Sequence, residues 1–187
     1  LYLRTCFQNT NVGRANAVLT IHNLRFQGIY DRKMIQYWSG LPDYVFNKDC
    51  MIQNWLDANM LKGGIAYCNK ITTVSNTYAG EIQTEEYGEG LAEHLRYHNN
   101  KIRGIVNGID TDNWNPATDK LLTANYDAES AVENKKINKK ALQESLGLEV
   151  DDHKMLIGLI SRLTNQKGLG LVNAVIPGIM DGNTQVV

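Results

Sequence analysis

The sequence predicts an α/β fold with mainly parallel sheets, because short β-rich runs alternate with helical patterns along the chain. The β-rich runs lie at residues 17–21, 71–74, 102–106 and 155–160. Helical patterns fill the intervals, and glycine or asparagine-glycine sequences separate the segments. In sheets of this kind, ligands bind beyond the carboxyl ends of the strands. The polar residues that follow the runs are therefore the first candidates for a binding site.

The first third of the chain begins with a strand. Residues 17–21 are apolar and β-branched and end at His22 and Asn23, which indicates a buried strand followed by a loop. Residues 29–60 are expected to be helical and irregular, with a break at a Gly-Leu-Pro sequence. Residues 61–68 are expected to continue as helix.

The middle of the chain contains two further strands and a capped helix. Ser75 follows the run at residues 71–74 and is expected to cap a helix from residue 76 to about residue 86. The run at residues 102–106 is closed by an Asn-Gly turn. Strands separated by helices in this way are expected to lie parallel in one sheet.

The remaining segments indicate a second domain. Residues 113–116 are irregular and mark the expected boundary. Residues 135–146 are helical, with Gly147 as the C-terminal stop. A strand at residues 155–160 and a helix from about residue 168 follow. The chain ends on a sequence typical of a strand's beginning, and we expect it to be an internal piece of a longer protein.

The composition restricts the classes of function. With 187 residues, of which 43% are hydrophobic, the chain can form a packed core. A net charge of −1 does not favour nucleic acid or an anionic membrane as a partner, because both attract an excess of positive charge. No apolar run approaches the roughly 20 residues of a membrane span. The three cysteines lack a C-x-x-C spacing and are expected to be reduced, buried or incidental thiols of a cytoplasmic protein. Three cysteines could form a metal site, but their spacing does not support one.

The turn after the strand at residues 155–160 carries two cations. Arg162 and Lys167 lie five residues apart, just before the next helix. A diphosphate suits this position, since the amides and the dipole at a helix N-terminus attract anions and the two side chains add positive charge. The spacing alone also fits a solvated turn with two surface cations. The turn contains neither a G-x-x-x-x-G-K phosphate loop nor a G-x-G-x-x-G dinucleotide motif.

Six segments of the chain together carry a more specific pattern. They are TIHNLRFQG (20–28), LKGGIAYCNKITTVSNTYAGEI (61–82), YGEGL (87–91), GIVNGIDTDNWNPATD (104–119), NKKALQESLGL (138–148) and SRLTNQKGL (161–169). In this order they resemble motifs of the bacterial glycogen synthases and plant starch synthases of glycosyltransferase family 5. The resemblance covers nearly the whole chain, and it favours the diphosphate interpretation of the cationic turn.

The resemblance implies a GT-B fold, in which two Rossmann-like domains face a deep cleft. Residues 1–115 would be the later part of the N-terminal, acceptor-side domain, and residues 116–187 the start of the C-terminal, nucleotide-sugar-binding domain. The implied reaction moves glucose from ADP-glucose to the non-reducing end of an α-1,4-glucan with retention of configuration, in the bacterial cytoplasm, with no cofactor and no required metal. The alternatives are a non-catalytic glucan- or nucleotide-binding module and a relative that uses UDP-glucose.

The same resemblance implies three catalytic residues. Arg162 and Lys167 would stabilise the negative charge that develops on the β-phosphate when its bond to glucose breaks. His22 would line the cleft near the donor glucose. Taken alone, His22 fits a structural histidine satisfied by the backbone, whereas its place at a strand end within a matching motif favours the substrate site.

Three further residues are expected to bind substrate. Asn107 would contact the sugar at the domain junction. Asn23 and Gly108 stand beside His22 and Asn107 at the strand ends.

The chain also departs from the family pattern. Its sequence contains neither the K-x-G-G-L loop nor the E-x-x-G-L motif that the family places at the donor, so the 187 residues alone are expected to be inactive. Gly170 stands where the family usually has aspartate. Aspartate early in a helix favours the helix dipole, so glycine is expected to lower helix stability without removing a ligand.

Three other features could indicate a metal or nucleic-acid site, but each favours a simpler interpretation. Asp110 and Asp112 form a D-x-D sequence that can hold a metal, yet a turn with helix-capping aspartates is expected. His94 and His98 have a zinc-compatible spacing, but no third ligand is evident and exposure is expected. The lysines of residues 135–140 are flanked by glutamates and are expected to form a solvated helix face.

Overall fold

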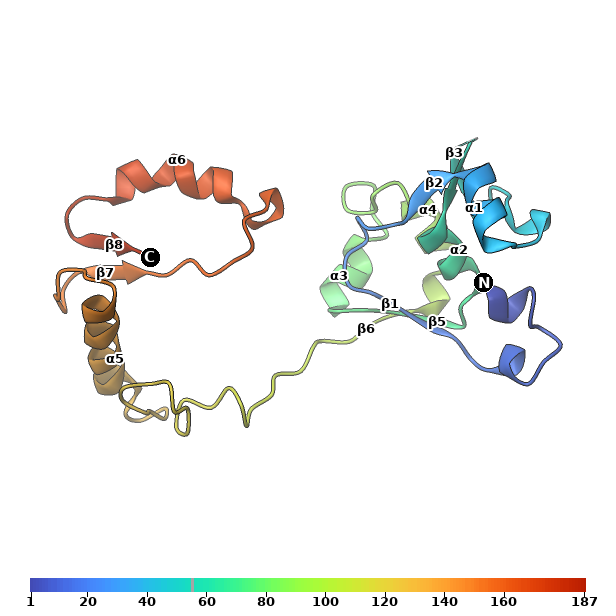
Figure 1. The fold of residues 1–187 in the computed structure, drawn as a ribbon. Helices are drawn as coiled ribbons and strands as arrows, with labels where there is room; N and C mark the ends of the chain where they lie inside the picture. Colours follow the sequence, from blue (N-terminus) through green and yellow to red (C-terminus); the bar gives the residue numbers. More distant parts are fainter. Residues whose placement is uncertain (55) are drawn as a thin grey trace. The chain divides into compact units, whose positions relative to one another are not determined.

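Three of the predicted strands pair in one sheet, in the order β1-β5-β6 (Figure 1). They are β1 (Val18–Ile21), β5 (Lys70–Thr73) and β6 (Ile102–Gly104). Both pairings are parallel, which confirms the predicted arrangement. The computed structural model describes residues 1–54 and 56–187 and divides into two units, called unit 1 (Leu1–Gly108) and unit 2 (Ile109–Val187).

The predicted domain boundary, between residues 115 and 116, lies in a stretch without helix or strand. That stretch runs from residue 105 to residue 130 and is described throughout. The division between the two units, after Gly108, falls in the same stretch.

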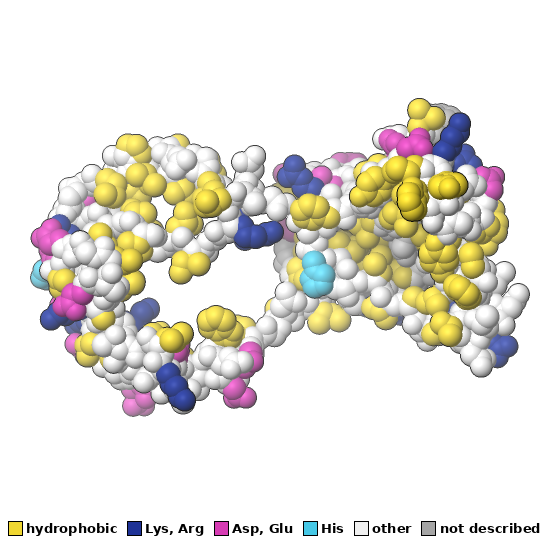
Figure 2. Space-filling model, viewed as in Figure 1, with side chains coloured by type: hydrophobic (Ala, Val, Ile, Leu, Met, Phe, Trp, Pro, Cys, Tyr) yellow, Lys and Arg dark blue, Asp and Glu magenta, His cyan; other side chains and the backbone are white. Residues whose placement is uncertain are grey.

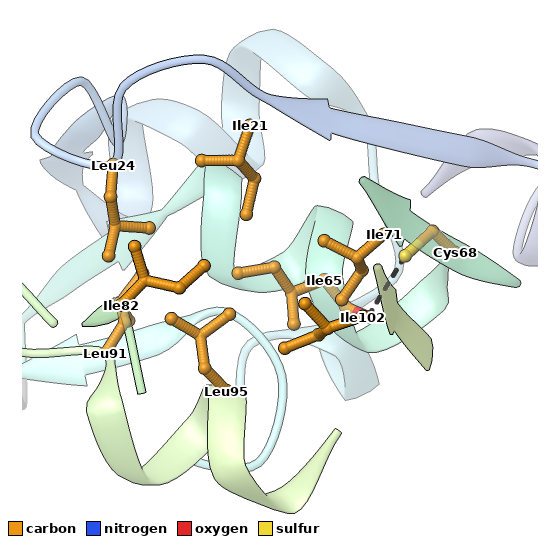
Figure 3. Packing of buried hydrophobic residues seen from close by; sticks show 9 residues of the cluster. All are labelled: Ile21, Leu24, Ile65, Cys68, Ile71, Ile82, Leu91, Leu95 and Ile102. Carbon is orange, nitrogen blue, oxygen red and sulfur yellow. Dashed lines mark hydrogen bonds between the residues drawn. The ribbon is translucent and has the colours of Figure 1, made fainter. Parts of the chain in front are cut away.

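The core of unit 1 lies among the parallel sheet and three helices. The helices are α2 (Met60–Tyr67), α3 (Asn76–Glu81) and α4 (Ala92–Tyr97). Nine buried residues form one cluster, as Figure 3 shows: Ile21, Leu24, Ile65, Cys68, Ile71, Ile82, Leu91, Leu95 and Ile102. Ile65 of α2, Ile71 of β5 and Leu95 of α4 are 0% exposed. Burial of apolar area at roughly 25 cal/mol per Å² makes such a cluster the main source of stability in unit 1.

The predicted cap of α3 is confirmed, but the helix is shorter than predicted. The Oγ atom of Ser75 accepts a hydrogen bond from the amide N–H of Tyr78 at 2.9 Å. The helix ends at Glu81, not near residue 86. Ile82 is the last apolar residue of its helical face and is fully buried, and the polar residues that follow it have no face to bury.

Residues 29–60 contain a second sheet, so the prediction that they are helical and irregular is wrong for much of the segment. The sheet is antiparallel, with the order β2 (Ile29–Asp31), β4 (Asp57–Asn59), β3 (Ile52–Asn54). One helix, α1 (Arg32–Ser39), follows β2. The strands are three residues long and contain Asp and Asn, which are depleted in strands, so local patterns do not indicate them. Trp55 falls within the same prediction and lies outside the described residues.

A second buried cluster explains why these short strands pair. It contains Leu41, Val45, Phe46, Cys50, Met51 and Ala58. Ala58 of β4 is 0% exposed, and Ile52 of β3 packs against the cluster. The segment between α1 and β3 supplies most of the cluster, so tertiary burial and not strand propensity produces this sheet.

Unit 2 contains two helices and a parallel pair of strands. They are α5 (Ala131–Ser145), β7 (Met155–Ile157), α6 (Leu169–Ile179) and β8 (Thr184–Val186). Gly147 follows α5 with a φ of +67°, a left-handed conformation that favours glycine, which confirms the predicted stop. The strand predicted at residues 155–160 ends at Ile157, and the strand predicted at the end of the chain is β8. As Figure 1 shows, α6 connects the two strands.

Among the described residues, no helix combines the length and the apolar character that a membrane crossing requires.

Candidate functional site

The carboxyl ends of the three parallel strands in unit 1 are aligned at one edge of the sheet. The register pairs Ile21 with Thr73 and Thr73 with Gly104, so the last residues of the strands form one row. The pairing extends one residue further, where the amide N–H of Ile105 donates to the carbonyl oxygen of Thr73 at 2.8 Å. The segments after the strands therefore leave from the edge at which ligands bind in parallel sheets.

His22 and Asn23 follow β1 directly at this edge, and both are exposed. The Oδ1 atom of Asn23 accepts a hydrogen bond from the amide N–H of Arg25 at 3.0 Å, which tightens the loop. The next side chain, Leu24, is only 1% exposed and belongs to the core cluster. The loop is thus anchored by one apolar side chain and leaves two polar side chains in solvent.

The far end of this loop is held by buried amide side chains. The Nε2 atom of Gln27 donates to the carbonyl oxygen of Glu89 at 2.9 Å, and its Oε1 atom accepts from Nδ2 of Asn59 at 2.6 Å. The Oδ1 atom of Asn59 accepts from the amide N–H of Lys62 at 2.9 Å and so caps α2. Gln27 was not predicted as a site residue. Its position in the motif at residues 20–28 is the signal that could have found it.

Asn107 and Gly108 lie just beyond β6, and both are exposed. The end of β6 lies directly against the first turn of α3, since a Cβ atom on Gly104 would be 2.4 Å from the Cα atom of Asn76. This close approach determines where the chain leaves the sheet. The structure therefore directs the segment with Asn107 and Gly108 out from the same edge as the loop after β1.

In unit 2, Arg162 and Lys167 occupy the connection between β7 and α6, and both are exposed. Lys167 ends a short 3₁₀ turn, η5 (Asn165–Lys167), and Gly168 directly precedes α6. The Oγ atom of Ser161 is buried without a hydrogen-bond partner among the described residues. In α6 the amides of Leu171 and Val172 donate to the carbonyl oxygen of Gly168 at 2.9 and 3.1 Å, so the free amides at a helix start would be those of Leu169 and Gly170. The connection therefore places two cations and helix N-terminal amides in one turn, an arrangement that attracts anions.

The predicted site residues fall into two groups. His22, Asn23, Asn107 and Gly108 belong to unit 1, and Arg162 and Lys167 belong to unit 2. Within residues 1–54 and 56–187, no three His, Cys, Asp or Glu side chains are grouped so that they could hold a metal ion.

His94 and His98 are half-buried, so the prediction that they are exposed is wrong. Their ring centroids lie 4.8 Å apart, and Nε2 of His94 forms a hydrogen bond with the carbonyl oxygen of Lys62 at 3.1 Å. The Nε2 atom of His98 is buried without a partner among the described residues. Burial, together with the nearby Lys101 and His94, lowers the pKa of His98 to about 4, and burial also lowers the pKa of His94. Both rings are therefore neutral near pH 7.

Among the aspartates and lysines set aside above, Lys135, Lys136 and Lys140 are exposed as expected, whereas Asp110 and Lys139 differ from expectation. The Oδ1 atom of Asp110 accepts hydrogen bonds from the amides of Asp112 at 3.1 Å and Asn113 at 3.0 Å, so Asp110 caps a turn and not a helix. The hydrogen bonds from Asn113 hold the pKa of Asp110 below its ordinary value. Lys139 is not simply solvated, because its Nζ atom donates to the carbonyl oxygen of Asp152 at 2.7 Å.

Parallel strands joined by helices in two units, with polar residues beyond the strand ends, define an α/β protein of the GT-B type. Residues 1–97 match the family model described as the starch synthase catalytic domain. The chain belongs to that family.

The chain is also similar to individual glycogen and starch synthases. It is 49% identical to a glycogen synthase of Lachnospira eligens over 91% of this chain and 36% of that protein. It is 47% identical to a glycogen synthase of Thermotoga petrophila over 100% of this chain and 38% of that protein. The solved catalytic domain of starch synthase IV from Arabidopsis thaliana, bound to ADP and acarbose, matches with a TM-score of 0.87 and 36% identity over 96% of this chain and 37% of that chain. The chain thus spans well under half the length of these relatives.

Proposed function

We propose that the chain forms part of a retaining glucosyltransferase that moves glucose from ADP-glucose to the non-reducing end of an α-1,4-glucan. Family membership supports this, and so does the similarity to a starch synthase solved with ADP. The observation that carries the proposal is the turn before α6, where Arg162 and Lys167 stand exposed beside a helix N-terminus. In this proposal, residues 1–115 belong to the acceptor-side domain and residues 116–187 to the nucleotide-sugar domain.

The proposed role of the turn follows from the chemistry of the leaving group. When the bond between glucose and the β-phosphate breaks, negative charge develops on the phosphate. Arg162 would bind phosphate oxygens through its planar guanidinium, and Lys167 would add a compact positive charge. The N-terminus of α6 supplies further positive potential. These groups act most strongly in the transition state, which is the condition for catalysis.

The proposed role of unit 1 is to bind the sugar. His22 and Asn107 would contact the donor glucose, and Asn23 and Gly108 would line the same position. The support is their exposure and the common sheet edge from which their segments leave. An exposed imidazole and amide side chains can donate to and accept from sugar hydroxyls.

Substitutions in a full-length synthase that carries this chain test the proposal. We expect Arg162→Ala and Lys167→Ala each to lower kcat/KM. The loss should correspond to about 3 kcal/mol or more of transition-state stabilisation, as with the loss of an oxyanion-stabilising donor. Lys167→Arg should restore little, because a planar fork does not replace a compact ammonium. Assays with ADP-glucose and UDP-glucose on glycogen would measure the donor preference at the same time.

Lys135→Ala is the matched control, since Lys135 is an exposed lysine of α5 outside the turn. It should change kcat/KM little. If Arg162→Ala and Lys167→Ala proved as harmless as this control, the turn would have no role in phosphate stabilisation.

A further inference from the structure

A side-chain hydrogen bond connects α3 to the loop after β1. The amide N–H of Leu24 donates to the hydroxyl oxygen of Tyr78 at 3.0 Å, across 54 residues of sequence. Leu24 is buried in the core cluster, and the side chain of Tyr78 packs against the same cluster. A partly buried backbone amide needs an acceptor, because an unpaired one costs free energy. The Tyr78 hydroxyl supplies that acceptor.

The helix that carries Tyr78 is itself firmly placed at the sheet edge. It follows β5 after Val74 and Ser75, and the Ser75 side chain caps it. Its first turn lies so close to β6 that a Cβ atom on Gly104 would be 2.4 Å from the Cα and N atoms of Asn76. The Thr73 hydroxyl adds a hydrogen bond to the carbonyl oxygen of Ser75 at 2.9 Å. The Tyr78 hydroxyl therefore occupies a position set by two of the three strands.

This position matters for the loop because Leu24 follows His22 and Asn23 directly. The other backbone anchor of the loop lies at its far end, where the amide N–H of Leu61 donates to the carbonyl oxygen of Gln27 at 3.0 Å. Between Ile21 and Gln27, the other hydrogen bonds join Asn23 to Arg25 and Phe26. They shape the loop but do not fix its position on the sheet. The hydrogen bond from Leu24 to Tyr78 of α3, together with the buried side chain of Leu24, does place it.

We infer that Tyr78 is a positioning residue for the proposed glucosyl transfer. By accepting the Leu24 amide, its hydroxyl holds His22 and Asn23 at the carboxyl edge of the sheet. The inference rests on the proposed function of His22. Tyr78 does not touch substrate in this scheme and acts through the loop alone, so its effect should vanish when His22 is removed.

The test is a double-mutant cycle in a full-length synthase that carries this chain. Tyr78→Phe removes the hydroxyl and keeps the ring in the core. We expect kcat to fall on the order of tenfold, below the roughly 100-fold cost of an ångström-scale misplacement, with the KM for ADP-glucose changed by less than about twofold. In a His22→Ala background, Tyr78→Phe should lower kcat no further.

Tyr67→Phe is the matched control, because Tyr67 is also half-buried and packs against the second cluster of unit 1. It should leave kcat unchanged. The ring signal of His22 in the NMR spectrum of the 187-residue chain gives a readout that does not depend on activity. It should shift with Tyr78→Phe and stay in place with Tyr67→Phe, while the signal of His153 stays in place with both.

The outcomes separate the two proposals. If His22→Ala left kcat intact, the proposed role of His22 would fail, and the inference about Tyr78 with it. If His22→Ala abolished most activity but Tyr78→Phe matched the Tyr67 control, only the inference would be overturned. Equal losses from Tyr78→Phe in both backgrounds, with an unmoved His22 signal, would also overturn it, since Tyr78 would then act independently of His22.

Discussion

The two units differ in how much apolar side chain they bury. Unit 1 encloses two apolar clusters, whereas the buried side chains described in unit 2 are two glutamines, Gln143 at 0% and Gln185 at 8% exposure. The apolar residues of α6 remain accessible, with Leu171 at 76% and Val175 at 54% exposure. Figure 2 shows hydrophobic side chains at the surface of unit 2 where α6 runs.

This difference indicates which of the two units is the more stable. In unit 2, Nε2 of Gln143 donates to Oε1 of Gln185 at 2.7 Å, and Nε2 of Gln185 donates to the carbonyl oxygen of Glu149 at 2.7 Å. These hydrogen bonds connect β8 to α5 and to the segment that follows α5, but each contributes only about 1 kcal/mol. Apolar burial contributes far more per side chain, so unit 1 should unfold at higher denaturant concentration than unit 2.

The largest expected effect contrasts a buried apolar residue of unit 1 with an exposed apolar residue of unit 2. Ile65→Ala, at a position with 0% exposure, should lower the free energy of unfolding of unit 1 by about 3 kcal/mol, because it removes buried methyl groups and leaves a cavity. Val175→Ala in α6 should change the stability of unit 2 by less than about 0.5 kcal/mol. Urea unfolding followed by hydrogen exchange in each unit measures both. Equal effects would show that α6 packs against apolar surface after all.

A smaller effect contrasts two glycines. Gly104→Ala should destabilise unit 1 by about 1–3 kcal/mol, because the new Cβ atom meets the backbone of α3. Gly170 lies in the first turn of α6 with no atom within 4 Å of an added Cβ, so Gly170→Ala should stabilise the helix by about 0.5–1 kcal/mol. Thermal unfolding of both variants checks the signs. A loss of stability in Gly170→Ala would contradict the open environment of α6.

A third expected effect is a pH dependence of the stability of unit 1 that comes from His98. The pKa of His98 is about 4 in the folded chain, against 6.5 for an ordinary histidine. The unfolded chain therefore binds more protons in this window, so unit 1 should lose stability as the pH falls from about 6.5 to about 4. His98→Gln should weaken that slope, while His153→Gln in unit 2 should leave it unchanged. Urea midpoints of the variants at several pH values measure the slope, and an unchanged slope in His98→Gln would refute the assignment.

Local signals in the sequence were sufficient for much of the fold. The strands at β1, β5, β6 and β7, the Ser75 cap and the Gly147 stop each depend on a few neighbouring residues, and the structure confirms them. The sheet β2-β4-β3 escaped prediction because its three-residue strands contain too few residues for a periodic pattern. The half-burial of His94 and His98 escaped because it depends on long-range packing, which for His94 includes a hydrogen bond with the carbonyl oxygen of Lys62 in α2.

For the candidate site, the sequence by itself determined which residue types follow which strands, and the ordered motifs determined the family. It placed Arg162 and Lys167 in the turn before a helix because that turn is defined by adjacent residues. Only the tertiary structure decided that Tyr78 holds Leu24, that Asn59 holds Gln27, and that three strand ends share one row. Sequence patterns report the local geometry of helices and strands, whereas these contacts join residues far apart in the chain, and burial and hydrogen-bond satisfaction select them once the chain has folded.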